Sequence, residues 1–487
     1  MSKRGLHFNV VLNTVGIALM LEGLFMLTAL PFSFYYRSGD HPAILISSGI
    51  TLLAGFLAWI LTKRSDQTNM GKREGYLIVT LTWILMSAFG LLPFMLSGSI
   101  SGFTDAFFET ISGFSTTGAS VLTSVEDIPK GILFWRSMTH WIGGMGIIVL
   151  SVAILPYLGS SGMQLFAAET SGPMKDKLHP RIRETAKRLW AVYVLLTAAE
   201  TIMLLFGGMS LFDALCHSFG TLATGGFSTR NLSMAAYSPY NQYVVLVFMF
   251  LAAINYTSHY FALRGNFSGY FRNQEFRFFT LIIIVCGLFI SLWLLFANHY
   301  ETEDAFRSGF FQVVSIISCT GFANDDFILW PTHLWVILLL LMFIGGCAGS
   351  TTGSIKSIRH LLLLKTGARE FRRIIHPSAV ISIKHNGNPV SEDVLLKILL
   401  FFFVYLLTFA TGTLLLCVNG VDLVSASSGV ASCMGGVGPA MGVYGPMSNY
   451  SAAPEFSKWV LSSCMLLGRL ELYAVFILFA PSFWKNK

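Results

Sequence analysis

Residues 103–120 read FTDAFFETISGFSTTGAS, and this stretch decides the fold of the whole chain. Its first part, 103–114, is mostly apolar, yet a helix needs about 20 apolar residues to cross a bilayer. The residues that follow, STTGAS, are small and include a glycine, which is typical of a turn. A short apolar helix before such a turn indicates a segment that enters a membrane and returns; a helix lying on the membrane surface is the alternative.

The composition of the chain is that of a membrane protein. Of its 487 residues, 54% are hydrophobic and only 12% are charged, so long uncharged runs must face lipid. These runs predict an all-α fold that crosses the membrane many times. Ten runs have the length of a full crossing: roughly 8–36, 43–62, 75–96, 131–155, 190–208, 240–263, 278–297, 333–363, 394–418 and 456–481.

The distribution of basic residues predicts the orientation. With ten crossings, both ends of the chain lie on one side, and most loop lysines and arginines lie on that side too. The opposite loops contain only Arg37, Lys130, Arg230 and Arg307. Because cytoplasmic loops are enriched in Lys and Arg, we expect both termini in the cytoplasm. The net charge of +7 thus reflects topology, and we expect no nucleic-acid partner.

The sequence offers no chemistry for an enzyme. The seven cysteines include no CxxC pair or metal-ligand spacing. There is no phosphate-binding Gly-Lys motif, no zinc-ligand cluster and no nucleophile elbow. We therefore predict no enzymatic activity and no organic cofactor in this chain.

The short helix and its turn recur three more times. Short apolar segments at 210–223, 303–318 and 422–434 lead into small-residue turns, and each turn precedes another crossing. The unit of helix, short helix, turn and helix therefore occurs four times after two N-terminal crossings. The turns are STTGAS at 115–120, ATGGFS at 223–228, SCTGFA at 318–323 and GGVGPA at 435–440. The expected boundaries are 1–70 for the N-terminal pair, then 71–160, 161–265, 266–375 and 376–487 for the four pore repeats.

A physical reason connects such turns with ion transport. Non-helical backbone is tolerated at membrane depth only where it is buried in protein or lines a water-filled path. Four turns in a pseudo-fourfold arrangement around one pore would aim their carbonyl oxygens at a common point. A ring of carbonyl oxygens replaces the hydration shell of a potassium ion, and glycine permits the backbone angles that turn the oxygens inward.

The chain resembles, over its whole length, the Trk/Ktr/HKT superfamily of potassium uptake proteins, and most closely its Trk-type pore-forming subunits. The stretches that carry the resemblance are DAFFETISGFSTTGA, ILFWRSMTHWIGGMGIIVLSVAILPYLG, ATGGFST, FIGGCAGST and LLGRLEL. The resemblance implies the transport of potassium through a filter of backbone carbonyls. It assigns the filter to Thr116, Thr117, Gly118, Thr224, Gly225, Gly226, Cys319, Thr320, Gly321, Gly436, Val437 and Gly438.

The eighth crossing contains GGCAGSTTGS at 345–354, which predicts a break in the helix. The alternative is a small-residue interface between helices. By resemblance this segment is an intramembrane loop that gates the pore. The residues so implied in gating are Gly345, Gly346, Gly349, Ser350, Thr351, Thr352, Gly353 and Lys356.

Arg469 lies in the middle of the expected tenth crossing, where an arginine costs about 3 kcal/mol unless it meets water or a partner. An ion pair with buried Glu22 or Glu200 would offset the cost of burying this charge. The resemblance implies instead that Arg469 projects into the pore below the filter and limits cation flow. Glu22, Glu200 and Lys397 show no spacing that assigns them a role.

Four other polar residues lie near the short helices. For His140 and His217 we expect hydrogen bonds within the core. Asp105 and Glu109 either attract cations to the mouth of a pore or cap the first short helix, and the sequence does not separate these roles.

The resemblance also implies partners: a cytosolic regulatory subunit with dinucleotide- or ATP-binding domains, and a second copy of the chain in a homodimer. The basic loops at 175–188 and 365–384 are candidate docking surfaces, although topology alone also explains their charge. A gated channel in the bacterial inner membrane is the favoured function. A proton- or sodium-coupled symporter is the alternative, but inverted repeats would be expected there, whereas these repeats all run the same way.

Overall fold

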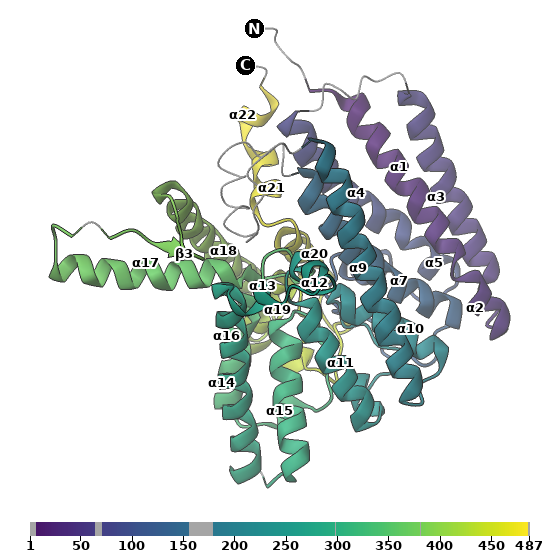
Figure 1. Cartoon of the computed structure of the whole chain (residues 1–487). Coiled ribbons are helices and arrows are strands. Elements are labelled where there is room, and N and C mark those ends of the chain that lie inside the picture. Colours follow the sequence, from purple (N-terminus) through teal and green to yellow (C-terminus); the bar gives the residue numbers. More distant parts are fainter. Residues whose placement is uncertain (1–5, 64–70, 155–178, 298, 380, 486–487) are drawn as a thin grey trace.

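The computed structural model describes residues 6–63, 71–154, 179–297, 299–379 and 381–485. Within them the chain is predominantly helical (Figure 1). The N-terminal pair is formed by α1 (Phe8–Leu27) and α3 (His41–Thr62), joined through α2 (Leu30–Tyr35). Gly16 and Gly55 allow the two long helices to touch, since a Cβ on Gly16 would lie 2.8 Å from the Gly55 oxygen.

Four stretches of chain follow, here called units 1 to 4, and each has a short helix between longer ones. Unit 1 contains α4 (Lys72–Gly90), α5 (Leu92–Leu96), α6 (Phe103–Phe114) and α7 (Lys130–Ile154). Unit 2 contains α9 (His179–Phe206), α10 (Leu211–Ala223), α11 (Pro239–Ala252), α12 (Tyr256–Ala262) and α13 (Ser268–Phe271). The 3₁₀ turn η3 (Ser233–Ala236) precedes α11.

Units 3 and 4 complete the chain. Unit 3 contains α14 (Gln274–Ala297), α15 (Thr302–Ile317), η4 (Phe327–Leu329), α16 (Thr332–Met342) and α17 (Ser357–Ile375). Unit 4 contains α18 (Glu392–Val418), α19 (Leu423–Gly435), η5 (Gly442–Tyr444), α20 (Glu455–Arg469), α21 (Tyr473–Phe476), η6 (Ile477–Phe479) and α22 (Pro481–Trp484). The short helices α6, α10, α15 and α19 begin and end within about a residue of the positions expected from the sequence.

Only four short strands occur in the described residues, in two pairs. The parallel pair β1 (Ile344–Gly345) and β2 (Ile355–Lys356) closes the base of the loop between α16 and α17. The antiparallel pair β3 (Lys384–His385) and β4 (Asn388–Pro389) forms a hairpin before α18.

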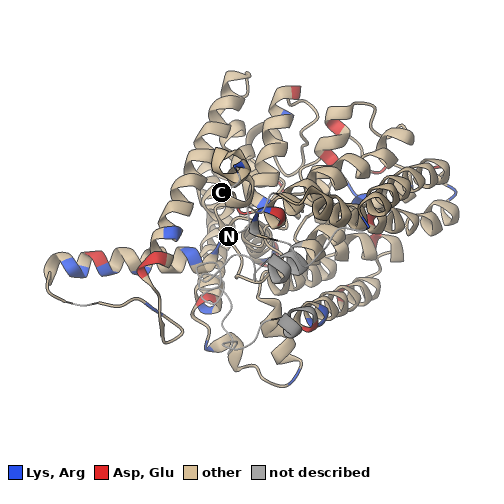
Figure 2. Ribbon diagram, turned by 90° about the horizontal axis from the view of Figure 1, so that it is seen from above, with Lys and Arg blue, Asp and Glu red and all other residues tan. Residues whose placement is uncertain are grey.

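Six helical stretches in the described residues are long and apolar enough to cross a membrane, or eight if each of two bent pairs counts as one crossing. The remaining two of the ten expected crossings correspond to α7 and to α16, which has only 11 residues. The long helices run side by side, whereas α17 projects away from them (Figure 1). Lys, Arg, Asp and Glu are sparse on the bundle and gather along α17 (Figure 2).

The sixth and tenth crossings differ from the expectation of continuous helices. Between α11 and α12 the chain bends by 104°, and between α20 and α21 it bends by 107°. The first bend follows from Asn255, whose side chain accepts a hydrogen bond from the Thr257 amide and so starts a new helix. At the second bend Glu471 and Leu472 both have a φ of +56°, a backbone region that ends a helix.

Candidate functional site

The four turns after the short helices share one backbone conformation. Each contains two residues with positive φ, separated by one residue: Thr116 and Gly118, Thr224 and Gly226, Cys319 and Gly321, and Gly436 and Gly438. In each turn the residue between them donates its N–H to the carbonyl five positions earlier, at 2.8 to 2.9 Å. These bonds close the ends of α6, α10, α15 and α19 in the same way. The sequence assignment of equivalent positions therefore agrees with the local structure.

The four turns meet one another in a closed ring. A Cβ added to Gly118 would lie 2.0 Å from the Gly225 oxygen, and one added to Gly226 would lie 2.0 Å from the Thr320 oxygen. A Cβ on Gly321 would lie 1.7 Å from the Val437 oxygen. The ring closes at Gly438, where a Cβ would lie 2.6 Å from the Thr117 oxygen. Each turn thus touches the next through a glycine that has no space for a side chain.

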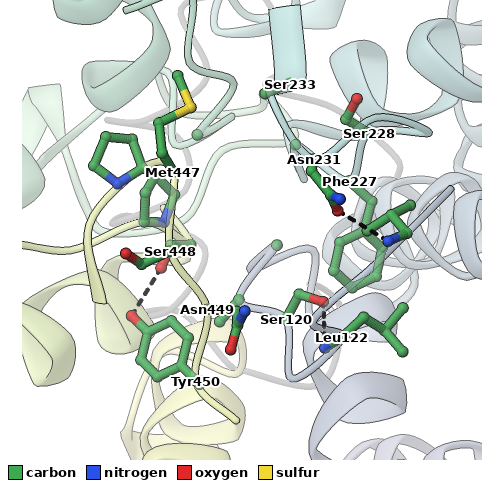
Figure 3. A pocket seen from close by; sticks show the side chains of 18 of the residues that line it. Ser120, Leu122, Phe227, Ser228, Asn231, Ser233, Met447, Ser448, Asn449 and Tyr450 are labelled. Atoms are coloured by element: carbon green, nitrogen blue, oxygen red, sulfur yellow. Dashed lines mark hydrogen bonds between the residues drawn. The ribbon is translucent and has the colours of Figure 1, made fainter. Parts of the chain in front are cut away.

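A cavity of about 330 Å³ opens beside this ring, and Gly118, Gly226, Gly321 and Gly438 all line it. The loops that follow the first, second and fourth turns form its walls, and unit 3 contributes Gly321 alone among the lining residues (Figure 3). Hydrogen bonds connect these loops across units: the Asn231 side-chain oxygen accepts from the Val125 amide at 2.9 Å. The cavity therefore lies where all four units converge.

Glu109 and Arg136 form a buried ion pair behind the ring, with an N–O distance of 2.7 Å. Glu109 also accepts from the Val121 amide at 2.8 Å, while Arg136 donates to the Ser228 oxygen at 3.1 Å. The Arg136 guanidinium lies 3.5 Å from the centre of the Phe227 ring. The pair connects α6, α7 and the segment after the second turn, so Glu109 is neither a helix cap nor a free carboxylate at the mouth.

Asp105 has a cationic partner as well, since its carboxylate lies 2.6 Å from Lys458 Nζ on α20. This contact connects the first short helix with unit 4. The sequence indicated neither the Arg136 partner of Glu109 nor the Lys458 partner of Asp105.

The two histidines make core hydrogen bonds, as expected from the sequence. His140 Nδ1 lies 3.0 Å from the Gly113 oxygen, and its Nε2 lies 3.3 Å from the Phe227 amide nitrogen. His217 Nε2 lies 3.0 Å from Ser228 Oγ. Both imidazoles lie between a short helix and the segment after the second turn.

The predicted break in the eighth crossing is present, and the loop that replaces the helix packs into the bend of unit 2. Cys347 donates its N–H to the Ala253 oxygen at 2.8 Å, and the Tyr256 amide donates to the Gly349 oxygen at 3.0 Å. A Cβ on Gly353 would lie 2.3 Å from the oxygen of Gly435, the last residue of α19. The loop therefore lies against the end of the fourth short helix.

Glu275 anchors both ends of this loop, a role for which the sequence gave no signal. Its Oε1 accepts from the Ala348 amide at 2.7 Å and from the Ile358 amide at 3.2 Å. Glu275 lies at the start of α14 and is fully buried. Ala348 and Ile358 lie 73 and 83 positions after Glu275, so only the folded chain brings the carboxylate close to them.

Arg469 is the last residue of α20 and contacts the loop directly. Its Nη1 donates to the Thr351 oxygen at 2.8 Å, and its Nη2 donates to the Gly143 oxygen of α7 at 3.0 Å. Among the described residues these partners are backbone carbonyls, so the pairing with Glu22 or Glu200 that the sequence allowed is not observed. Lys356 donates to the Thr352 oxygen, also within the loop.

A second cation connects α17 with the bend of unit 4. Arg359 Nη2 lies 2.7 Å from a carboxylate oxygen of Glu471, one of the two residues with positive φ at that bend. Glu471 follows Arg469 by two positions in the expected tenth crossing. In the structure it lies beyond the end of α20.

Comparison with known proteins places these features in a family. The family model TrkH, described as a cation transport protein, matches residues 40–486. The chain is 42% identical to the Trk system potassium uptake protein TrkH of Salmonella typhimurium, over 99% of this chain and 100% of that protein. It is 36% identical to the Trk system potassium uptake protein TrkG of Escherichia coli, over 99% of both chains.

A solved structure is also similar. The crystal structure of the potassium transporter TrkH from Vibrio parahaemolyticus superposes with a TM-score of 0.91 and 39% sequence identity. The match covers 99% of this chain and 100% of the other.

The buried ion pair provides a test of what holds the ring in place. Replacing Glu109 by Gln leaves the Arg136 charge buried without an anion, which typically costs about 3 to 5 kcal/mol. We expect a clear fall in the thermal unfolding temperature of the detergent-solubilised protein. The double variant E109Q/R136Q should recover part of this loss because no unpaired charge remains.

The comparison variant is D105N, because Asp105 is more than one-third exposed whereas Glu109 is fully buried, and because the buried Lys458 keeps its hydrogen bond to the Ser451 oxygen. Its unfolding temperature should fall less than that of E109Q. A double variant as unstable as E109Q would contradict the account of the pair.

Proposed function

The chain belongs to the TrkH family of cation transport proteins, and from this we propose that it takes up potassium ions across the bacterial inner membrane. It is a multi-pass membrane protein of a transporter family and not an enzyme. The observation that carries the proposal is the closed ring of four equivalent turns beside one cavity, because such a ring gathers backbone oxygens from all four units.

In this proposal the four turns form the selectivity filter. A dehydrated potassium ion is coordinated by backbone oxygens of the turn residues, which include the Gly225, Thr320, Val437 and Thr117 oxygens that the neighbouring glycines approach. The C-terminal ends of α6, α10, α15 and α19 lead directly into the turns and add their negative dipole ends. Potassium is the transported substrate, and the proposal needs no organic cofactor.

The loop between α16 and α17 is the proposed gate. Its position against the end of α19 and its hydrogen bond to Arg469 support this role. With the loop in this position, Arg469 contributes a buried positive charge beside the proposed path of the ion. Withdrawal of the loop would require this hydrogen bond and the contacts with the bend of unit 2 to break.

The orientation and the partners belong to the same proposal. Both termini are cytoplasmic, in keeping with the loop charges and with the start of α1 and α22 lying at one end of the molecule (Figure 1). The relatives are named as parts of a Trk system, which supports the presence of other components. The proposed component is the one that the family resemblance implies, a cytosolic regulatory subunit with nucleotide-binding domains. The chain acts as a homodimer in this account, and the basic loops at 175–188 and 365–384 are proposed docking surfaces. Residues 175–178 and 380 of these loops lie outside the described residues.

The proposed uptake activity is tested first by growth. Expression should restore growth at low potassium in a bacterium that lacks its own uptake systems. Flux into proteoliposomes under an imposed voltage, without a proton or sodium gradient, then separates a channel from a coupled symporter. Growth no better than that of the host with an empty vector would contradict the proposal.

The filter assignment predicts a change in ion selectivity on replacement of Gly321 by Ser. The new side chain meets the Val437 oxygen, so the fourth turn must move away from its position in the ring. We expect a higher sodium-to-potassium flux ratio in proteoliposomes. Gly118 has the same kind of contact with the Gly225 oxygen, so G118S should show the same change.

The matched comparison is G436S, because a Cβ at Gly436 would have no neighbour closer than 3.8 Å. Its flux ratio should change less than that of G321S. G438S provides a milder test, since its nearest oxygen would lie at 2.6 Å. Flux ratios identical to the parent in G118S, G321S and G438S would remove the turns from the selectivity mechanism.

The gate assignment predicts a faster flux when Arg469 is replaced by Ala. The change removes both carbonyl contacts and a buried positive charge, so the loop is freed and the barrier to cations falls. Initial potassium flux per protein should increase. R469K is the control for the charge. Lysine keeps the positive charge, but its single ammonium group does not reproduce the two hydrogen bonds that the planar guanidinium makes to the Thr351 and Gly143 oxygens. A folded but inactive R469A would favour a purely structural role.

A further inference from the structure

One of the four turns differs from the others in how its last carbonyl is used. The Tyr450 hydroxyl donates a hydrogen bond to the Gly438 oxygen at 2.9 Å (Figure 3). The corresponding oxygens of Gly118, Gly226 and Gly321 show no side-chain donor within the part of the chain that the structure describes. The fourth corner of the ring is therefore chemically distinct.

The position of the Tyr450 hydroxyl is fixed by contacts on several sides. Its backbone amide donates to the oxygen of Ser120, just after the first turn, at 2.8 Å. Its ring stacks on Tyr444, with centroids 4.4 Å apart and planes 12° apart, and is also near Phe108. The residue is 2% exposed. The hydroxyl is therefore a rigid donor at the junction of units 4 and 1.

We propose that Tyr450 is a specificity-determining positioning residue that adjusts the Gly438 carbonyl so that the ring favours potassium over sodium. The inference rests on the proposed function of the turns as a filter. It goes beyond that function because it names a side chain outside the turns that donates a hydrogen bond to the carbonyl of the fourth-turn glycine, Gly438.

The physical reason lies in the two lone pairs of a carbonyl oxygen. The Tyr450 hydroxyl occupies one lone pair and leaves the other for an ion. Its hydrogen carries a partial positive charge, which weakens the attraction of that oxygen for a cation and restricts its movement. Coulomb attraction increases at short distance, so a smaller ion gains more from a strong and mobile oxygen. A weakened, fixed oxygen therefore disfavours sodium more than potassium.

The experiment replaces Tyr450 by Phe in the full-length chain. This change removes one oxygen atom and leaves the ring stack and the backbone bond to Ser120 in place. Purified protein in proteoliposomes is tested for potassium and sodium flux under an imposed voltage, and its thermal unfolding is measured in parallel. We expect the potassium-to-sodium flux ratio to fall about threefold, the scale of one neutral hydrogen bond.

The matched control is Y444F, which removes a hydroxyl from the other ring of the stack. The described residues show no hydrogen bond from that hydroxyl to a turn oxygen. Its flux ratio should equal that of the parent. An equal fall in Y444F and Y450F would overturn the inference, because it would assign the effect to the stack and not to the bond.

The glycine variants separate this inference from the filter assignment itself. If G321S or G438S changes the flux ratio and Y450F does not, the role of Tyr450 is wrong and the filter stands. If none of these variants changes the ratio, the filter assignment fails and the role of Tyr450 fails with it. A fall in unfolding temperature of Y450F without a change in the ratio would identify Tyr450 as a packing residue only.

Discussion

The structure depends on four contacts in which a glycine lies directly against the backbone oxygen of the next turn. No side chain fits at Gly118, Gly226, Gly321 or Gly438, because a Cβ at each would lie within 2.6 Å of that oxygen. The contacts run from unit 1 to unit 4 and back to unit 1, so no turn shifts without its neighbours. This closure explains why the same backbone conformation recurs in four stretches whose sequences otherwise differ. Membrane depth adds the second constraint, since non-helical backbone must be buried in protein there.

Contacts from the surrounding structure must stabilise the turns, because a positive φ at Thr116, Thr224 and Cys319 is unfavourable for residues other than glycine. Each short helix contributes a hydrogen bond from the turn back to its last residues. Arg136 and His140 lie one helical turn apart on α7, behind the first two turns. Each side chain makes one hydrogen bond to α6 and one to the segment after the second turn. The fourth turn is held differently, through Tyr450. The backbone conformation is therefore equivalent in the four turns, whereas the support around each turn is not.

The sequence predicted those features that short-range chemistry determines. The short helices, their turns and the break at 345–354 follow from apolar length and from glycine, and the structure contains all of them. The bends at Ala253–Asn255 and at Glu471 could not be found in this way, because the residues there are neither glycine nor proline. Glu471 has a positive φ and pairs with Arg359, a residue 112 positions away that the local sequence does not indicate. The partners of Glu109, Glu275 and Arg469 were missed for the same reason, since each contact joins residues far apart in the chain.

The bends and the loop are connected to the ring by very few residues. Arg469 bonds to Thr351 in the loop and to Gly143 on α7. Gly143 itself lies against the end of α6, where a Cβ would be 2.1 Å from the Phe114 oxygen. On the other side, Gly353 of the loop lies against Gly435, the last residue of α19 and the first of the fourth turn. The proposed gate is therefore connected, directly or through Arg469 and Gly143, with the ends of α19 and α6, the short helices that lead into the fourth and first turns. Displacement of the loop changes the packing beneath the first and fourth turns, so a mechanism that opens the loop also acts on the oxygens proposed to select the ion.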